Sequence, residues 1–173
     1  AHTGPMEVSK SVYGFRKKSR ADGRLIELLE LDAPMSPHAY HTCGVWIEPP
    51  PALRDDLERR NRNYARGALH ALEHVLVALS PLVVACEGDE FACQCTRRRG
   101  DAHAERIVLY ERRKGGLGLA ELLLPLLRTL VAAAEARLRT CSCATGCPGC
   151  ILLAGCGEYS DGLDNQGALE VAQ

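Results

Sequence analysis

Five of the chain's nine cysteines fall within sixteen residues near its carboxyl end: Cys141, Cys143, Cys147, Cys150 and Cys156. Thiolate sulfurs are preferred ligands of Zn²⁺, which proteins usually hold in tetrahedral sites with four ligands. Pro148 and Gly149 separate Cys147 from Cys150 and favour a tight turn, which directs both sulfurs to one point. Glycines flank Cys156 and allow backbone N–H groups to approach its sulfur. This segment therefore predicts one structural zinc site.

Five sulfurs compete for four positions on such an ion. We expect Cys147, Cys150 and Cys156 to bind together with one or both of Cys141 and Cys143, whose sulfurs can close a small ring on one metal. A set of disulfides is the alternative, but the odd cysteine count and the absence of a visible secretory segment argue against it. The same features favour a reducing, intracellular compartment: cytoplasm or nucleoid in a bacterium, nucleus in a eukaryote.

A second group with chemical potential is His70-Ala-Leu-Glu73-His74, which matches the H-x-x-E-H pattern of inverted zinc proteases. On a helix, His70 and His74 lie one turn apart and can reach one metal, with Glu73 as a general base. A metallohydrolase is therefore one hypothesis. The interpretation we favour is structural, with both histidines beside a leucine stripe and hydrogen-bonded against a sheet, and it assigns no catalytic residue.

The remaining cysteines give weaker signals. Cys93-Gln-Cys95 is a second C-x-C pair, with Cys86 and His103 as its nearest potential partners in sequence. A second zinc site in this region is an alternative with little support from spacing. Cys43 is interpreted as a small core residue.

Two basic groups are candidates for contacts with a DNA backbone. They are Arg97, Arg98 and Arg99, and Arg112, Arg113 and Lys114. The second group precedes Gly115-Gly-Leu-Gly118, whose N–H groups at the start of a helix suit a phosphate. A solvated surface and a tight strand-to-helix connection are the alternatives. Because the net charge is −1, any such surface is a local patch.

Short β-prone segments and two long amphipathic segments must position these groups. The expected strands are 8–15, 25–31, 41–47, 82–86 and 107–110. The first three, with an Asp22-Gly23 turn, predict an antiparallel meander. Residues 88–100 are predicted to form a loop.

Helical periodicity covers two longer regions. Leucines at spacings of three and four predict a helix within 52–79. A second helix is expected over 119–139, with a kink or a late start near Pro125. Asp164 is expected to cap a short helix at 166–171.

These elements predict an α+β fold, an antiparallel sheet packed by two long helices with a carboxyl-terminal Cys₄ zinc segment. Hydrophobic content of 46% and charged content of 25% suit one globular core. We expect a scaffold at 1–140 and a zinc-binding segment with a terminal helix at 141–173, together forming one compact domain. No apolar run is long enough to predict a membrane span.

Several stretches, in order along nearly the whole chain, resemble one family. They are Tyr13 to Lys17, Thr42 to Trp46, His70 to His74, Tyr110-Glu111 with Gly115 to Ala120, Cys141 to Cys150, Cys156-Gly157, and Leu163-Asp164 with Ala168-Leu169. The chain is similar to the zinc-binding carboxyl-terminal domain of superfamily 2 DNA repair helicases of the MrfA type, relatives of fungal and plant RecQ-like helicases. Glu111 stands where that family usually has Asp.

The resemblance implies an accessory module that binds Zn²⁺, docks on helicase motor domains in the same polypeptide and guides single-stranded DNA during 3′-to-5′ translocation. The chain has no G-x-x-x-x-G-K-[ST] motif, so by itself it is not expected to hydrolyse ATP. The resemblance also treats the H-x-x-E-H helix as scaffold. A module that binds only other proteins, without DNA contact, remains the third hypothesis.

Overall fold

The computed structural model describes residues 1–60, 64–94, 106–143 and 146–173. Its main sheet has four strands in the order β1-β4-β6-β5, and all neighbouring pairs are antiparallel. The strands are β1 (His2–Lys10), β4 (His38–Ile47), β6 (Ile107–Glu111) and β5 (Phe91–Cys93). Together with the helices this sheet gives the α+β architecture that the sequence predicts.

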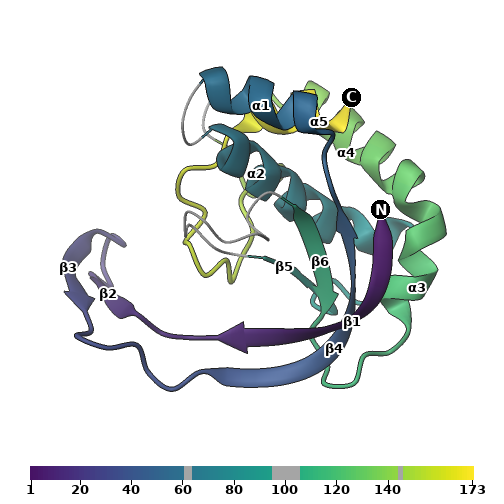
Figure 1. Cartoon of the computed structure of the whole chain (residues 1–173). Coiled ribbons are helices and arrows are strands. Elements are labelled where there is room, and N and C mark those ends of the chain that lie inside the picture. Colours follow the sequence, from purple (N-terminus) through teal and green to yellow (C-terminus); the bar gives the residue numbers. More distant parts are fainter. Residues whose placement is uncertain (61–63, 95–105, 144–145) are drawn as a thin grey trace.

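The helices gather on one side of the curved sheet (Figure 1), with α2 next to β5 and β6. Their bounds are α1 (Pro51–Arg60), α2 (Tyr64–Leu79), α3 (Leu119–Leu123), α4 (Leu127–Thr140) and α5 (Asn165–Ala172), with 3₁₀ turns at Ser80–Leu82 and Leu124–Leu126. No helix in the described ranges has the length and hydropathy needed to cross a membrane.

Helix α2 is the centre of the core. Leu69, Leu72 and Leu76 are almost fully buried, and alanines and valines fill most of its other faces. It packs on the sheet and on α4 and α5, so apolar residues are needed all round. Gly67 allows the closest approach, because a Cβ there would lie 2.5 Å from the Gly162 carbonyl oxygen.

The predicted three-stranded meander is wrong. The first predicted strand breaks after Lys10, and β4 pairs with β1 from His2↔Trp46 to Lys10↔His38. The intervening strands β2 (Gly14–Lys18) and β3 (Leu25–Glu30) form a separate two-stranded sheet. Alternation identifies strands but not their partners, so the break redirects both pairings.

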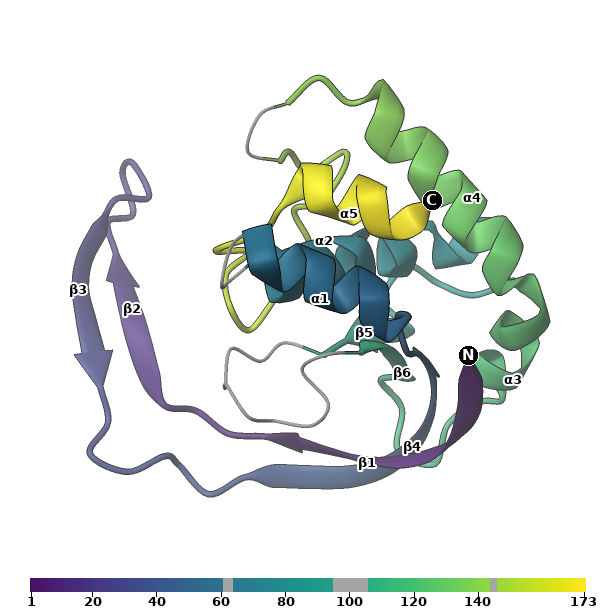
Figure 2. The same ribbon diagram turned by 45° about the horizontal axis from the view of Figure 1, so that its top comes forward.

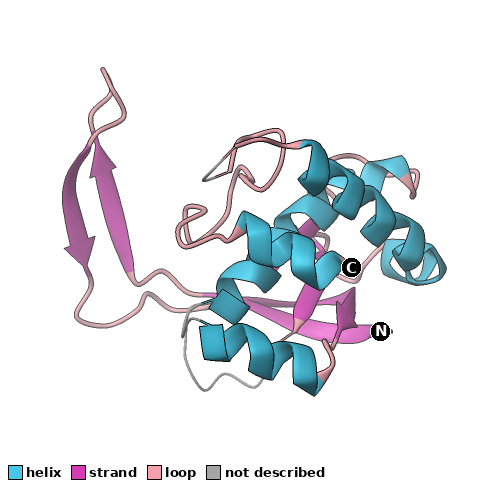
Figure 3. Ribbon diagram, turned by 90° about the horizontal axis from the view of Figure 1, so that it is seen from above, coloured by secondary structure: helices cyan, strands magenta, loops and turns pink. Residues whose placement is uncertain are grey.

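We call residues 12–35 the arm, because β2 and β3 extend away from the body (Figures 2 and 3). Its base is closed by the Leu31 amide donating to the Tyr13 carbonyl at 2.9 Å. In β2, Arg16 pairs with Asp161 at 2.6 Å and lies over the Tyr159 ring, 4.1 Å from the centroid. These contacts tie the arm to the carboxyl-terminal segment.

The predicted strand at 82–86 is also wrong. The loop predicted at 88–100 holds at 88–90, is interrupted by a strand at Phe91–Cys93, and from residue 95 lies outside the described residues. The amides of Val83 and Val84 both donate to the Ser80 carbonyl, at 3.1 and 3.0 Å, and form a turn. The strand lies later, at Phe91–Cys93, where all three residues are buried. Three residues are too few to show alternation, and their pairing with β6 decides the conformation.

The helix predictions hold in their main features. A 3₁₀ turn containing Pro125 separates α3 from α4, as expected for a proline within a helical run. Asp164 caps α5, and its carboxylate accepts a hydrogen bond from the Gly167 amide at 3.0 Å. The region 52–79 forms two helices, α1 and α2.

Candidate metal centre

Four cysteine sulfurs come together directly after α4. The sulfur atoms of Cys141, Cys143, Cys147 and Cys150 all lie within 4.8 Å of one another. The individual sulfur separations are 3.1 Å for Cys141–Cys143, 3.7 Å for Cys141–Cys147, 3.2 Å for Cys143–Cys150 and 3.5 Å for Cys147–Cys150. Among the described cysteines none forms a disulfide.

This arrangement fits a tetrahedral zinc ion. With Zn–S bonds of about 2.3 Å, the edges of a sulfur tetrahedron are about 3.8 Å long. The observed separations of 3.1–3.7 Å are slightly shorter and require only small outward movements of the sulfurs. Four soft donors with this geometry form a closed structural site, with no position left for substrate.

Local structure explains how the sulfurs converge. Helix α4 ends at Thr140, and Cys141 is already extended. The Cys147–Cys150 turn is closed by the Cys150 amide, which donates to the Cys147 carbonyl at 2.9 Å, while the Cys147 amide donates to the Cys150 sulfur at 3.1 Å. The Arg137 side chain donates to the Gly149 carbonyl and fixes the turn on α4.

The thiols of the cluster differ in pKa. Hydrogen bonds from the Cys143 amide and thiol lower the pKa of Cys141 to about 7. The contacts of Cys143 with Cys141 and Cys150 raise the pKa of Cys143 to about 12. Zinc requires thiolates, so metal binding at neutral pH displaces protons from this cluster and weakens as pH falls.

Cys156 lies outside this group of four. Its sulfur is 3.6 Å from His70 Nε2, and its side chain is buried. The structure thus places Cys141 and Cys143 both in the cluster, where the sequence left their membership open. Assignment of zinc to these sulfurs remains a prediction.

Within the H-x-x-E-H motif, Glu73 has different hydrogen-bond partners from His70 and His74. Glu73 is fully buried, and its carboxylate accepts from Arg66 at 2.6 Å and from the Val108 amide at 2.9 Å. Burial raises the pKa of Glu73, while Arg66 and the Val108 amide favour its charged form. A carboxylate held by two donors is poorly placed to activate a metal-bound water, so this geometry opposes a hydrolase.

No role was predicted from the sequence for Glu111, the buried residue that ends β6. Its carboxylate accepts from the amides of Leu117 and Ala120, the latter at 3.0 Å. Leu117 is one of the residues whose N–H groups suit a phosphate, and its amide is therefore engaged inside the protein. The amides of Gly115 and Gly116 are engaged as well, by the His41 and Arg113 carbonyls at 2.8 and 3.0 Å. An acidic residue at the end of an apolar strand, just before a glycine-rich loop, was the available signal.

The basic candidates divide into two groups. Arg112, Arg113 and Lys114 are exposed on the connection after β6. Arg113 pairs with Glu90 at 3.0 Å, and this pairing raises its pKa. Arg97 to Arg99, together with Cys95 and His103, lie outside the described residues.

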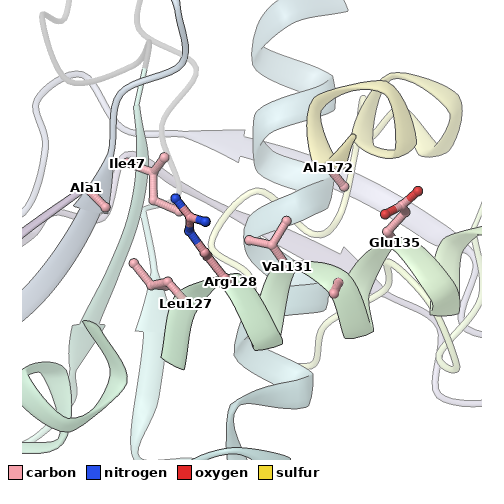
Figure 4. Close-up of a pocket in the computed structure, with 8 residues that line it drawn as sticks. Ala1, Ile47, Leu127, Arg128, Val131, Glu135 and Ala172 are labelled. Carbon is pink, nitrogen blue, oxygen red and sulfur yellow. The ribbon is translucent and has the colours of Figure 1, made fainter. Parts of the chain in front are cut away.

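An open hollow of about 330 Å³ lies between the end of β4, α4 and α5. Figure 4 shows its lining, which is mainly Ile47, Leu127 and Val131, with Arg128 and Glu135 as its charged side chains. It contains no cysteine or histidine. This hollow therefore offers no alternative to the cysteine cluster as the functional site.

Comparison with known proteins agrees with the cysteine cluster. Residues 72–151 match the model of the MrfA Zn-binding domain, MZB. The ATP-dependent helicase HRQ1 of Saccharomyces cerevisiae is 26% identical over 178 residues, which cover 95% of this chain and 16% of HRQ1. The uncharacterized ATP-dependent helicase YprA of Bacillus subtilis is 27% identical over 111 residues, 64% of this chain and 14% of YprA.

One further protein and one solved structure also match this chain. The uncharacterized protein MJ1572.1 of Methanocaldococcus jannaschii is 29% identical over 108 residues, which cover 61% of this chain and 96% of that protein. The crystal structure of the DUF1998 helicase MrfA bound to DNA and AMPPNP superimposes on this chain with a TM-score of 0.56 at 19% identity, covering 100% of this chain and 22% of MrfA. At that identity the likeness shows a shared fold.

The fold and the four-cysteine cluster thus resemble the zinc-binding module found in helicases. Residues 72–151 match the model of the MrfA Zn-binding domain family, and the chain is homologous to HRQ1 and YprA. It spans only 16% of the length of HRQ1 and 14% of that of YprA. The family match contains all four clustered cysteines and ends before Cys156.

Proposed function

We propose that this chain is a zinc-stabilised accessory domain of an ATP-dependent DNA repair helicase. In this role it supports single-stranded DNA binding and 3′-to-5′ translocation by motor domains of the same polypeptide. The four-sulfur cluster within an MrfA-type domain is the observation that carries the proposal. The proposal includes an intracellular location, because a DNA repair helicase acts where the DNA is.

Zinc would cross-link the end of α4 to the segment that leads to α5. Cys141 and Cys143 follow α4, whereas Cys147 and Cys150 begin the segment that leads to α5. Ile151, next to Cys150, is fully buried in the main core. The metal would therefore fix the carboxyl-terminal segment against α2 and α4 without taking part in catalysis.

The arm supplies a surface for docking on the motor. Eight of the thirteen large apolar side chains exposed in the described part of the chain lie on it: Val12, Tyr13, Phe15, Leu25, Ile26, Leu28, Leu29 and Met35. Both faces of β3 are exposed. A two-stranded ribbon is marginal in water, and a concentrated apolar surface usually marks an interface. This chain covers only 16% of HRQ1 and 14% of YprA, so we propose the motor domains of the same polypeptide as the partner of the arm.

Introducing positive charge on the apolar surface of the arm tests this docking. Ile26→Lys combined with Leu28→Lys should lower DNA-stimulated ATP hydrolysis about tenfold or more in the helicase that carries this domain, because interface anchors each contribute about 1–2 kcal/mol or more. The melting temperature and zinc content of the domain should not change. Leu122→Lys, on α3 with 58% exposure, is the matched control. If the wild type, the Ile26→Lys, Leu28→Lys variant and the Leu122→Lys control hydrolyse ATP at equal rates, the arm is not the docking surface.

The exposed residues Arg112, Arg113 and Lys114 are the proposed contacts to DNA phosphates. Replacing all three with Ala should weaken binding of single-stranded DNA and lower the slope of log K against log salt by about 2, at about 0.7 for each lost phosphate contact. Because Glu90 already pairs with Arg113, that residue should contribute least. The measurement is a fluorescence titration of a labelled oligonucleotide at several salt concentrations.

Three exposed arginines elsewhere provide the charge-matched control: Arg59, Arg128 and Arg139 replaced with Ala. If both triple variants lose affinity equally, the effect is one of net charge and not of a binding patch. If neither changes affinity, the accessory domain binds protein alone, which is the interaction-module hypothesis.

A further inference from the structure

A second cluster of metal-binding side chains lies apart from the four cysteines. One ligand atom each from His70, His74 and Cys93 lies within 4.8 Å of the other two. The histidines come from consecutive turns of α2, and the cysteine is the last residue of β5. The two imidazole rings are 4.4 Å apart between centroids, at an interplanar angle of 72°. Two weak signals of the sequence, an i, i+4 histidine pair and a C-x-C cysteine, thus meet in space.

The His74 ring is oriented as in metal sites. Its Nδ1 lies 2.7 Å from the Ile151 carbonyl oxygen, so Nδ1 carries the proton and donates it. Nε2 then carries the lone pair. Histidines that bind metals usually donate their other ring N–H to a backbone carbonyl or a carboxylate, which fixes the tautomer.

Cys156 lies beside one member of this group of three and is the residue that we assign as its fourth donor. Its sulfur is 3.6 Å from His70 Nε2. In a tetrahedral site with Zn–N of about 2.05 Å and Zn–S of about 2.3 Å, nitrogen and sulfur ligands lie about 3.6 Å apart. Cys156 therefore stands at the separation expected of a ligand that shares a zinc ion with His70.

Burial decides what such a site can do. His70, His74, Cys93 and Cys156 are at most 8% exposed, so bulk water has little access to a metal held among them. Glu73, between the two histidines in sequence, faces Arg66 and Val108 instead. The arrangement suits a closed structural ion that joins α2, β5 and the carboxyl-terminal segment, and it lacks the general base of a hydrolase.

We propose that His70, His74, Cys93 and Cys156 form a second structural metal site, for Zn²⁺ or another divalent ion that accepts both imidazole and thiolate. This site is separate from the four-cysteine cluster. Ile151 connects the two, because it follows Cys150 in the chain and its carbonyl accepts from His74. The zinc-binding segment is then fixed at both ends, at α4 by the first ion and at α2 by the second.

Metal counting tests the second site. The purified chain, saturated with zinc and freed of loosely bound ions by gel filtration, should contain two zinc ions per chain by elemental analysis. His70→Ala with Cys93→Ala should reduce the count to one, and Cys143→Ser with Cys147→Ser should also leave one. Cys43→Ala, which removes a part-buried thiol outside both clusters, should retain two.

Cobalt spectroscopy separates loss of the site from loss of the fold. Cobalt in a four-sulfur site and cobalt in a two-nitrogen, two-sulfur site absorb differently, so the metal-free wild-type chain should give two components on titration. The His70→Ala, Cys93→Ala variant should keep the four-sulfur component alone, which also shows that its first site has folded. A wild-type chain that holds a single ion, lost with the four cysteines and kept without His70 and Cys93, would overturn the proposal.

Discussion

Removal of zinc should abolish the cooperative thermal unfolding of this domain. Structural zinc in small Cys-rich sites contributes about 10–16 kcal/mol of apparent binding free energy at neutral pH, whereas a whole domain is stable by about 5–15 kcal/mol. The metal-free chain should therefore retain helical content but lose the sharp transition. Differential scanning calorimetry with and without a strong chelator, at pH 7.5, is the measurement.

Single replacements localise the effect. Cys147→Ala or Cys150→Ala should lower the melting temperature by tens of degrees, since about 2–4 °C is lost per kcal/mol in a domain of this size. Cys43→Ala should shift it by only a few degrees. Loss of zinc should also become easier as pH falls, because protons compete for the four sulfurs. A chelated chain that melts at the wild-type temperature would show that the sulfurs cluster without need of a metal.

The parts of this structure that the sequence predicts correctly are local. Cys141 to Cys150 span ten residues, so spacing and a Pro-Gly turn are enough to bring four sulfurs together. The leucine stripe of α2 and the Asp164 cap likewise depend on neighbours within one or two helical turns. Pro125 predicts the break between α3 and α4 from the sequence alone, because proline lacks the N–H that a continuous helix needs.

The parts that the sequence could not give are contacts between distant segments. Cys156 lies 86 positions from His70, and no periodicity relates the two. The pairing of β4 with β1 depends on a break in the first strand that composition does not mark. Phe91–Cys93 is a strand because β6 lies beside it, and not because three residues carry a pattern.

Glu73→Ala should have the second-largest effect, a loss of about 3–5 kcal/mol in the free energy of unfolding. The carboxylate joins three elements through its partners. Arg66, which it holds at 2.6 Å, also donates to the Gln94 carbonyl at 3.0 Å and to the Arg106 carbonyl at 3.3 Å, at the end of β5 and the start of β6. Without the carboxylate, the Val108 amide and much of the Arg66 charge would remain buried without this acceptor.

Urea denaturation at 25 °C measures this loss, and Glu135→Ala is its control. Glu135 forms an exposed i, i+4 pair with Arg139 at 2.7 Å, and its removal should cost about 0.5 kcal/mol or less. The comparison also separates two roles for the H-x-x-E-H helix. A structural Glu73 predicts that Glu73→Gln is destabilised as well, because an amide cannot pair with the Arg66 charge. A catalytic Glu73 would predict the opposite, a Gln variant of wild-type stability that has lost a hydrolytic activity.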